Sequence, residues 1–217
     1  MTTWPAHPPL TGQGPRVSGP PRWPKGPFPE KYRCRAVHDR FAGAWLSDPG
    51  VRALARAAER GLTPHPRHDD PYVRLFTNAS DAALDAMRSE PGVTAFRWAL
   101  GTRDDLVVEA DGPMLGLAPT PDTIEALVLV GVSGPQQGIG TAAVARFLTT
   151  LRSFSKYRLE ALGEERIKLS ITPRDLAAAN LIADRMREVC PPLARAHADV
   201  GPIVSEILAG RFVMDWR

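Results

Sequence analysis

Residues 157–172 read YRLEALGEERIKLSIT, and they carry the clearest secondary-structure signal in the chain. Hydrophobic and polar residues alternate on both sides of Gly163-Glu164-Glu165, a pattern typical of two β-strands joined by a short turn. We therefore predict a β-hairpin with strands at 157–162 and 166–172. Because side chains alternate along a strand, two sets in the second strand should face opposite ways: Ile167, Leu169 and Ile171 on one side, Lys168 and Ser170 on the other.

Helical patterns lie on both sides of this hairpin. Before it, apolar residues recur at three- and four-residue steps from Val144 to Leu151, which predicts a helix capped by Thr141. After it, Pro173 should start the longest helix, and Pro191-Pro192 should stop it. A short helix over 200–208 and a last strand over 212–216 complete the predicted order.

The first half has the same mixed character. Asp48-Pro49 should open a helix that ends at Gly61, and Ser80 should cap another. We predict strands over 72–77, 93–100, 106–110 and 114–118, and Asp122 as the cap of a further helix, preferred over a strand at 123–132. Since strands and helices are mixed without regular alternation, the predicted class is α+β. We expect an antiparallel or mixed sheet with helices packed on it, and split βαβ (ferredoxin-like) character in the second half.

Basic charge is concentrated at the N-terminus. Residues 1–40 hold seven Lys and Arg against two acidic residues, a net of +5, whereas the whole chain carries +3 and residues 41–217 therefore −2. Residues 1–29 also contain nine prolines and four glycines, which prevent a helix or a strand ladder from propagating. We predict an extended or disordered arm over 1–40 and an α+β body over 41–217, with 41–118 and 119–217 as candidate subdomains.

Composition excludes several classes of protein. No run of about 18 apolar residues occurs, so we expect no membrane span, and no secretory signal is visible. The two cysteines are too few for a disulfide scaffold, which favours a cytoplasmic location. A specific nucleic-acid partner is not expected, because the basic charge lies on the arm and not on the body.

The densest group of metal-ligand residue types lies at His65, His68, Asp69 and Asp70. Histidine and carboxylate side chains together suit a divalent metal. A solvated polar loop is the favoured interpretation, because Pro66 and the loop setting do not supply a rigid ligand geometry. A pairing of Cys34 with His38, one helical turn further on, is a weaker candidate for nucleophilic catalysis.

Residues 131–141, GVSGPQQGIGT, place several glycines just before a predicted helix. Exposed backbone N–H groups at a helix start attract anions. The stretch Gln137-Gly138-Ile139-Gly140 resembles the pyrophosphate loop of GCN5-related acetyltransferases. That resemblance implies acetyl-CoA as cofactor, held by Gln137, Gly138, Gly140 and Thr141, although Pro135 occupies a position that is usually Arg or Gln in the family. The favoured interpretation is a tight loop that opens a packing helix.

A second resemblance covers residues 119–217. The order of Gly131–Gly134, Gly140-Thr141, Cys190-Pro191, Val200-Gly201 and Met214–Trp216 resembles the uncharacterised bacterial family called domain of unknown function 4253. The family implies a fold and no established reaction. Residues 72–118, with Leu75-Phe76-Thr77 and Asp111-Gly112-Pro113, resemble the SseB-type secretion-associated domain, which is linked to protein interaction.

These observations favour a binding or accessory protein that acts through protein–protein contacts, with no catalytic residue and no cofactor assigned. The alternative is an acyl-CoA-dependent N-acetyltransferase, which the loop at Gln137–Thr141 would support. The basic arm could add weak, salt-sensitive attraction to an acidic partner.

Overall fold

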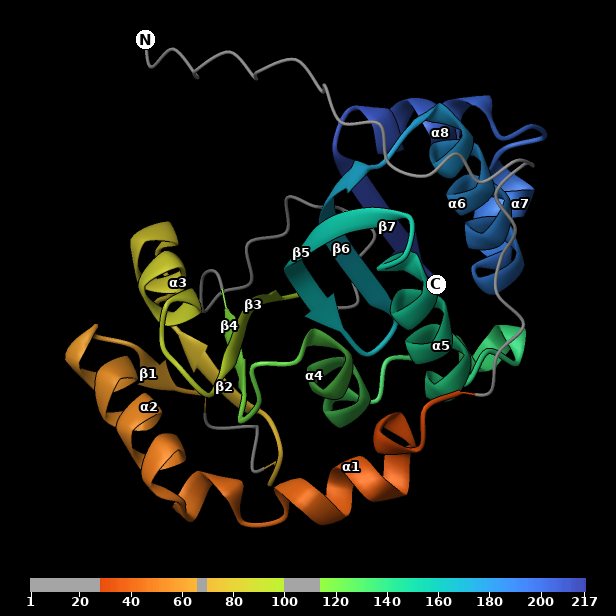
Figure 1. The fold of residues 1–217 in the computed structure, drawn as a ribbon. Helices are drawn as coiled ribbons and strands as arrows, with labels where there is room; N and C mark the ends of the chain where they lie inside the picture. Colours follow the sequence, from red (N-terminus) through yellow and green to blue (C-terminus); the bar gives the residue numbers. More distant parts are fainter. Residues whose placement is uncertain (1–27, 66–69, 100–113) are drawn as a thin grey trace, which may run out of the picture.

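The computed structural model describes residues 28–65, 70–99 and 114–217 (Figure 1). These residues form eight α-helices, three short 3-10 helices and one seven-stranded mixed sheet. The predicted α+β class is therefore confirmed. The strand predicted over 106–110 and residues 1–27 of the predicted arm lie outside the described residues.

The sheet has the strand order β1-β2-β4-β3-β5-β6-β7. Neighbouring strands are antiparallel except β3 and β5, which run parallel with Arg97 level with Ala161. The predicted hairpin is confirmed as β5 and β6, which pair over nearly their whole length with a bulge between Leu159 and Ala161. The strands are β1 (Thr63–Pro64), β2 (Arg74–Thr77), β3 (Thr94–Trp98), β4 (Leu115–Ala118), β5 (Ser155–Gly163), β6 (Arg166–Pro173) and β7 (Arg211–Asp215).

Helices cover one face of the sheet along most of its length and the other face at one end only (Figure 1). The longer layer packs on β5–β7 and on one side of β2 and β3, while α2 and α3 pack on the opposite side of β2, β3 and β4. The helices are α1 (Cys34–Phe41), α2 (Asp48–Glu59), α3 (Asp81–Arg88), α4 (Thr123–Val130), α5 (Thr141–Leu151), α6 (Leu176–Val189), α7 (Pro191–Ala196) and α8 (Gly201–Leu208).

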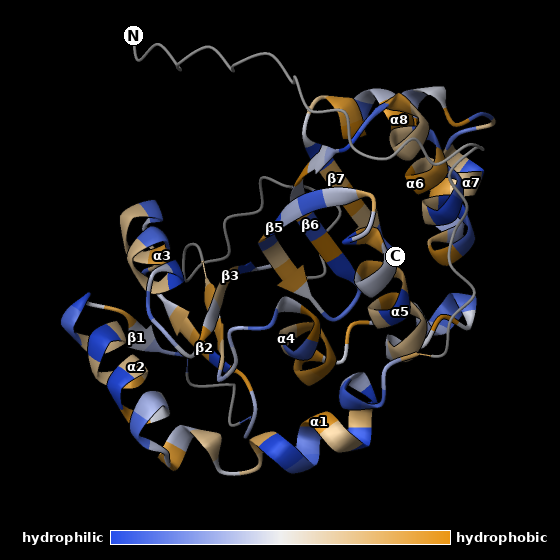
Figure 2. Ribbon diagram, in the orientation of Figure 1, coloured by the Kyte–Doolittle hydropathy of each residue, from blue (hydrophilic) through white to orange (hydrophobic). Residues whose placement is uncertain are grey.

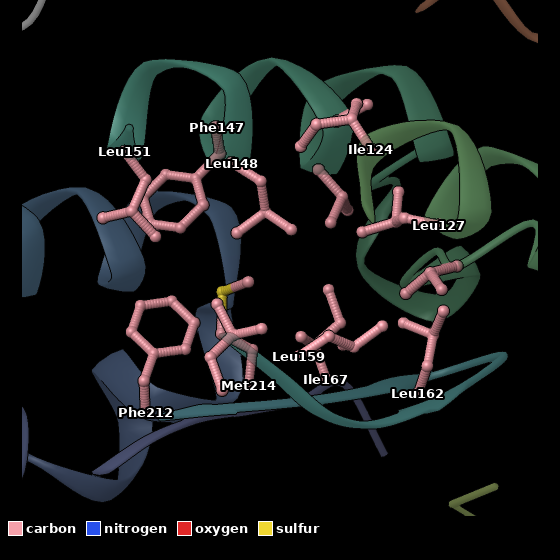
Figure 3. Close-up of a cluster of buried hydrophobic side chains, with 14 of the residues drawn as sticks. Ile124, Leu127, Phe147, Leu148, Leu151, Leu159, Leu162, Ile167, Phe212 and Met214 are labelled. Atoms are coloured by element: carbon pink, nitrogen blue, oxygen red, sulfur yellow. The ribbon is translucent and has the colours of Figure 1, made fainter. Parts of the chain in front are cut away.

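Two hydrophobic clusters fill these layers, and the alternation of side chains along each strand separates them. In β2, Leu75 belongs to the larger cluster and Phe76 to the smaller; in β3, Phe96 and Ala95 divide in the same way. Gly116 in β4 is required here, because a Cβ at this position would lie 2.3 Å from the Phe96 ring. The larger cluster is centred where α4 and α5 face β5–β7 (Figure 3).

The hairpin residues take the sides that alternation predicts. Ile167, Leu169 and Ile171 are buried in the larger cluster, whereas Lys168 is exposed and Ser170 is half-buried on the opposite side. In Figure 2, hydrophilic and hydrophobic residues both occur along β5 and β6. The two-residue period of β6 therefore explains which of its side chains are buried.

Strand order in the second half differs from the expected split βαβ arrangement. A split βαβ unit joins two parallel strands through a helix and places a third strand between them. In the second half, the helices after β6 instead join it to β7, which is its antiparallel neighbour. The first half does contain such a unit, because β2 and β3, joined through α3, lie on either side of β4 and both pair with it antiparallel. Moreover, β5, β6 and β7 lie side by side as an antiparallel set, although α6, α7 and α8 separate β6 from β7 in sequence. The single sheet also joins strands from both candidate subdomains.

Two predicted helix boundaries are corrected, and a third is confirmed but is followed by a helix that was not predicted. Pro173 ends β6, and α6 begins at Leu176 because Asp175 accepts a hydrogen bond from the Ala178 N–H. Thr141 is the first helical residue of α5 and not its cap, which is Gly140. Pro191-Pro192 ends α6 but also opens α7, since proline suits the first turn of a helix.

The predicted arm is shorter than residues 1–40. Residues 30–32 form a 3-10 helix, η1 (Glu30–Tyr32), and α1 follows directly. Tyr32 is 2% exposed and Val37 is 0% exposed, so this segment is part of the larger hydrophobic cluster. The proline-rich stretch ends at Pro29, so the chain can become helical from Glu30 onward.

No helix in the described residues is long and apolar enough to cross a membrane.

Candidate functional site

The glycine-rich loop at 131–141 is closed on itself. Gly131 ends α4 with a positive φ of 76°, and Gly134 and Ile139 exchange two backbone hydrogen bonds of 2.7 and 2.9 Å. A short 3-10 helix, η3 (Pro135–Gln137), lies between them, followed by Gly138 with a φ of 70°. The positive φ values explain glycine at positions 131 and 138 without any ligand.

This loop holds the C-terminal end of the chain. The Gln137 Nε2 donates a hydrogen bond to the Trp216 carbonyl oxygen at 2.7 Å. Trp216 is fully buried, and its indole Nε1 donates to the Val189 carbonyl oxygen at 2.7 Å. A Cβ on Gly134 would lie 2.3 Å from the indole ring, so only glycine allows this close approach. The loop therefore acts as a structural clamp on Trp216.

The four predicted cofactor-binding residues are neighbours in space, but their polar groups are not directed together. The Gln137 amide is committed to Trp216, whereas Gly138 and Gly140 are exposed at the surface. Gly140 accepts the N–H groups of Ala143 and Val144 in the first turn of α5. What the arrangement offers an anion is the start of α5 alone. Acetyl-CoA binding at this loop stays a prediction.

Replacing Gln137 with alanine should test the structural role of the clamp. The variant leaves the Trp216 carbonyl without its donor, and we expect the free energy of unfolding to fall by about 1 kcal/mol. A larger loss is not expected, because the buried Gln137 Oε1 has no partner among the described residues and so contributes no second hydrogen bond. Urea unfolding followed by circular dichroism measures the change. Unchanged stability would show that the clamp does not depend on Gln137.

The predicted metal-ligand group is only partly described. His65 is 9% exposed, and its backbone N–H bonds to the Leu75 carbonyl oxygen beside β2. Asp70 accepts the N–H groups of Tyr72 and Val73 at 2.7 and 3.0 Å, so its carboxylate caps the turn into β2. His68 and Asp69 lie outside the described residues. Among the residues that the structure does describe, no three His, Cys, Asp or Glu side chains gather as a metal group.

The two thiols occupy different surroundings. Cys34 opens α1, and the His38 ring on the same helix packs against Tyr72 with ring centroids 4.6 Å apart. Cys190 is fully buried, and burial raises the pKa of its thiol to about 11. Its Sγ lies 3.3 Å from the Asp215 carbonyl oxygen. Cys190 therefore behaves as a small buried side chain at the end of α6, as the sequence indicated.

A polar network that the sequence did not reveal joins the N-terminal segment to the body. The Asp122 carboxylate accepts hydrogen bonds from the Tyr32 hydroxyl at 2.7 Å, from Arg152 at 2.8 Å and from the Ile124 N–H at 2.9 Å. Arg152 also donates to the hydroxyls of Tyr32 and Tyr157 at 3.2 Å. Only the Ile124 contact, a helix cap, was predictable locally.

The surroundings of Asp122 favour its ionised form. Partial burial by itself would raise the pKa of Asp122, but the hydrogen bonds of Tyr32 and Arg152 outweigh it and hold the pKa below its usual value. Burial raises the pKa of the Tyr157 hydroxyl. A carboxylate with a lowered pKa that is already paired suits a structural role better than proton transfer.

The described residues also line surface hollows elsewhere. One of about 420 Å³ lies at the corner between α1 and α2, and Arg40 is the only charged residue in its lining. Another, of about 370 Å³, lies between α5 and α6, where Arg185 and Glu188 pair with each other. Neither lining contains a histidine or a cysteine. These hollows bring together no pair of nucleophile and base.

The most distinctive surface is the outward side of β5, β6 and β7, which we call the basic half-face. It continues the sheet face on which α2 and α3 lie, but those helices cover β2, β3 and β4. Its side chains are Lys156, Arg158, Glu160, Ala161, Arg166, Lys168, Ser170, Thr172, Arg211, Val213 and Asp215. Lys156, Arg158, Lys168, Thr172 and Arg211 are exposed. The alternation in β6 predicted that Lys168 and Ser170 lie on this face. The strand order adds the residues of β5 and β7 beside them.

The fold and this surface define an α+β protein with a mixed sheet that the described helices cover incompletely. No protein-family model, no curated protein and no solved structure matches the chain significantly. The resemblances to domain of unknown function 4253 and to the SseB-type domain therefore stay predictions.

Proposed function

We propose that this chain is a non-catalytic binding protein that acts through contacts with a protein partner, and that the basic half-face is the contact surface. The observation that carries the proposal is the uneven covering of one sheet. Sheets normally bury at least one face, and most faces that lack a helix layer are solvated and polar. Here the part that no described helix covers is a three-stranded surface with exposed long side chains, which a docking surface requires.

The clamp on Trp216 supports this assignment indirectly. The loop that could serve an acyl-CoA cofactor instead uses its amide side chain to hold the end of β7 against the body. The same contact stabilises the edge of the basic half-face. No contact around Gln137–Thr141 favours the acetyltransferase alternative over the structural role. The proposed role of the basic arm with an acidic partner concerns residues that lie mainly outside the described ranges.

Site-specific photo-crosslinking in cells tests the proposed surface. A photoreactive amino acid is placed at Ser170 or Thr172 on the basic half-face, and at Asn180, an exposed position of α6 on the opposite side of the sheet. We expect one protein to be crosslinked from both half-face positions and not from Asn180. The same protein, purified, should bind the full-length chain saturably.

Matched bulky substitutions complete the test. Ser170→Trp should weaken binding of that protein at least tenfold by obstructing the basic half-face, whereas Asn180→Trp should leave it unchanged. The proposal is wrong if adducts form only at Asn180, if they form equally at all three positions, if no specific adduct forms at all, or if Ser170→Trp binds normally while its circular dichroism is native.

A further inference from the structure

The basic half-face differs in charge from the rest of the body. Its outward positions hold five cations against the two carboxylates of Glu160 and Asp215, a net of +3; the cations are Lys156, Arg158, Arg166, Lys168 and Arg211. Residues 41–217 as a whole carry −2 by sequence. Positive charge is therefore gathered on this half-face of a body that is otherwise acidic, which is the distribution that steers an oppositely charged partner.

Both carboxylates of the half-face are already neutralised. Glu160 lies between Arg158 at 2.8 Å and Arg88 of α3 at 2.9 Å. Asp215 lies between Arg166, at 3.7 Å, and Arg217. Burial would raise the pKa of each carboxyl, but the arginines outweigh it and hold both pKa values below the usual range. These carboxylates therefore fix the arginines in place and present little free negative charge to a partner.

Strand register brings three cations around Ser170. Arg158 lies opposite Ser170 on β5, and Arg211 lies opposite it on β7. Lys168 is two residues from Ser170 on β6 and points to the same side. With strands about 4.8 Å apart and alternate residues about 7 Å apart, these positions lie about 8–10 Å from one another. That spacing is comparable to the Debye length of about 8 Å at physiological salt, so their fields reinforce each other.

The exposed ends of these side chains are available to a partner. The side chains of Arg158 and Arg211 are 65% and 61% exposed. Arg158 pairs with Glu160, and Arg211 donates two hydrogen bonds to Glu206 of α8, so each guanidinium keeps further N–H groups for a partner. No ion pair holds Lys168 within the described residues, and Lys168 is exposed. The three groups together can donate to several carboxylates at once.

The residues between these cations indicate whether the half-face suits a single-stranded nucleic acid or an acidic protein surface. Single-stranded nucleic acids bind by stacking bases on aromatic side chains as well as by charge. The outward positions of the half-face carry no aromatic residue; between the cations lie Ser170, Thr172 and Val213, which suit contact with a protein surface. Resting on the proposed function, we propose that the partner presents a cluster of Asp and Glu side chains that Arg158, Lys168 and Arg211 bind.

Fluorescence anisotropy with the full-length protein and three labelled probes tests this inference. The probes are a ten-residue polyglutamate peptide, a ten-residue polylysine peptide and a ten-nucleotide oligothymidylate. At 20 mM salt we expect saturable binding of polyglutamate and none of polylysine, with polyglutamate affinity falling at least tenfold at 200 mM salt.

Matched charge reversals locate the binding. Lys168→Glu with Arg211→Glu should weaken polyglutamate binding at least tenfold. Arg33→Glu with Arg35→Glu changes the net charge equally at exposed positions near α1, and should weaken it less than threefold. If the first pair disturbs the circular dichroism spectrum, Lys156→Glu with Arg158→Glu replaces it.

Three outcomes would overturn the inference. Equal weakening by both pairs would assign the affinity to net charge alone. Tenfold tighter binding of oligothymidylate would make the half-face a nucleic-acid surface. Absence of polyglutamate binding at 20 mM salt would contradict the inference that the partner is acidic. In that case crosslinks confined to Ser170 and Thr172 would still support the proposed function. The two proposals can therefore fail separately.

Discussion

Replacing Trp216 with alanine should lower the free energy of unfolding by about 3–5 kcal/mol, the usual cost of removing a fully buried aromatic side chain. Trp216 is 0% exposed. Its removal also leaves the Val189 carbonyl oxygen without the indole donor, and it opens space above Gly134, whose missing side chain exists to admit the ring. The end of β7 should lose its anchor to α6 and to the glycine-rich loop.

Equilibrium urea unfolding of the two proteins measures this loss, and Trp216→Phe is the matched control. Phenylalanine keeps most of the buried ring but lacks the N–H, so it should cost about 1–3 kcal/mol. A third variant, Gly134→Ala, perturbs the same contact from the other side because its Cβ would lie 2.3 Å from the indole. Stability of Trp216→Ala within 1 kcal/mol of the parent would contradict the clamp.

Replacing Asp122 with alanine should lower the free energy of unfolding by about 2–3 kcal/mol. About 1 kcal/mol comes from losing the cap of α4, because Asp122 accepts the Ile124 N–H. The remainder, about 1–2 kcal/mol, comes from the hydrogen bonds of Tyr32 and Arg152, which lose a charged acceptor. Since Tyr32 belongs to η1, the N-terminal segment should loosen first, and faster amide hydrogen exchange over residues 30–41 would report it.

The effect of Asp122 should depend on pH, and Asp122→Asn is the variant that shows it. The pKa of Asp122 is lowered in the folded protein, so its contribution is complete above the unfolded value of about 3.9 and disappears as pH falls through the folded value. Asparagine keeps the cap but not the charge. The stability difference between parent and Asp122→Asn should therefore shrink below about pH 4. A difference that stays constant from pH 7 to pH 3 would show that the ion pair with Arg152 contributes nothing.

Local signals predicted most elements correctly. Ser80 and Asp122 were expected to cap helices, and their side chains accept the N–H groups of Ala83 and Ile124. The hairpin at β5 and β6 was predicted because its turn and its two-residue period are both local. Helix boundaries were predicted wrongly where one residue suits two structures. Pro173 can end a strand or begin a helix, and the cap at Asp175 decides that the helix starts later.

The candidate site was less predictable, because its parts come together through strand order. Gln137 was considered a candidate cofactor-binding residue because of the glycines beside it. In the structure its side chain bonds to Trp216, which lies 79 residues later in the chain. Arg158 and Arg211 lie 53 positions apart in the chain and meet on either side of Ser170 only because β5 and β7 both pair with β6. No local period contains that information.

The sequence by itself determined the α+β class, the hairpin and the side to which Lys168 and Ser170 turn, because propensity, capping and alternation act over a few residues. Tertiary structure alone decided that η1 and α1 join the core through Tyr32 and Val37. It also decided that, in the part of the chain that the structure describes, no helix layer lies on the outward side of β5–β7. Both outcomes depend on which distant apolar faces can be buried together, and that is a property of the whole packed chain.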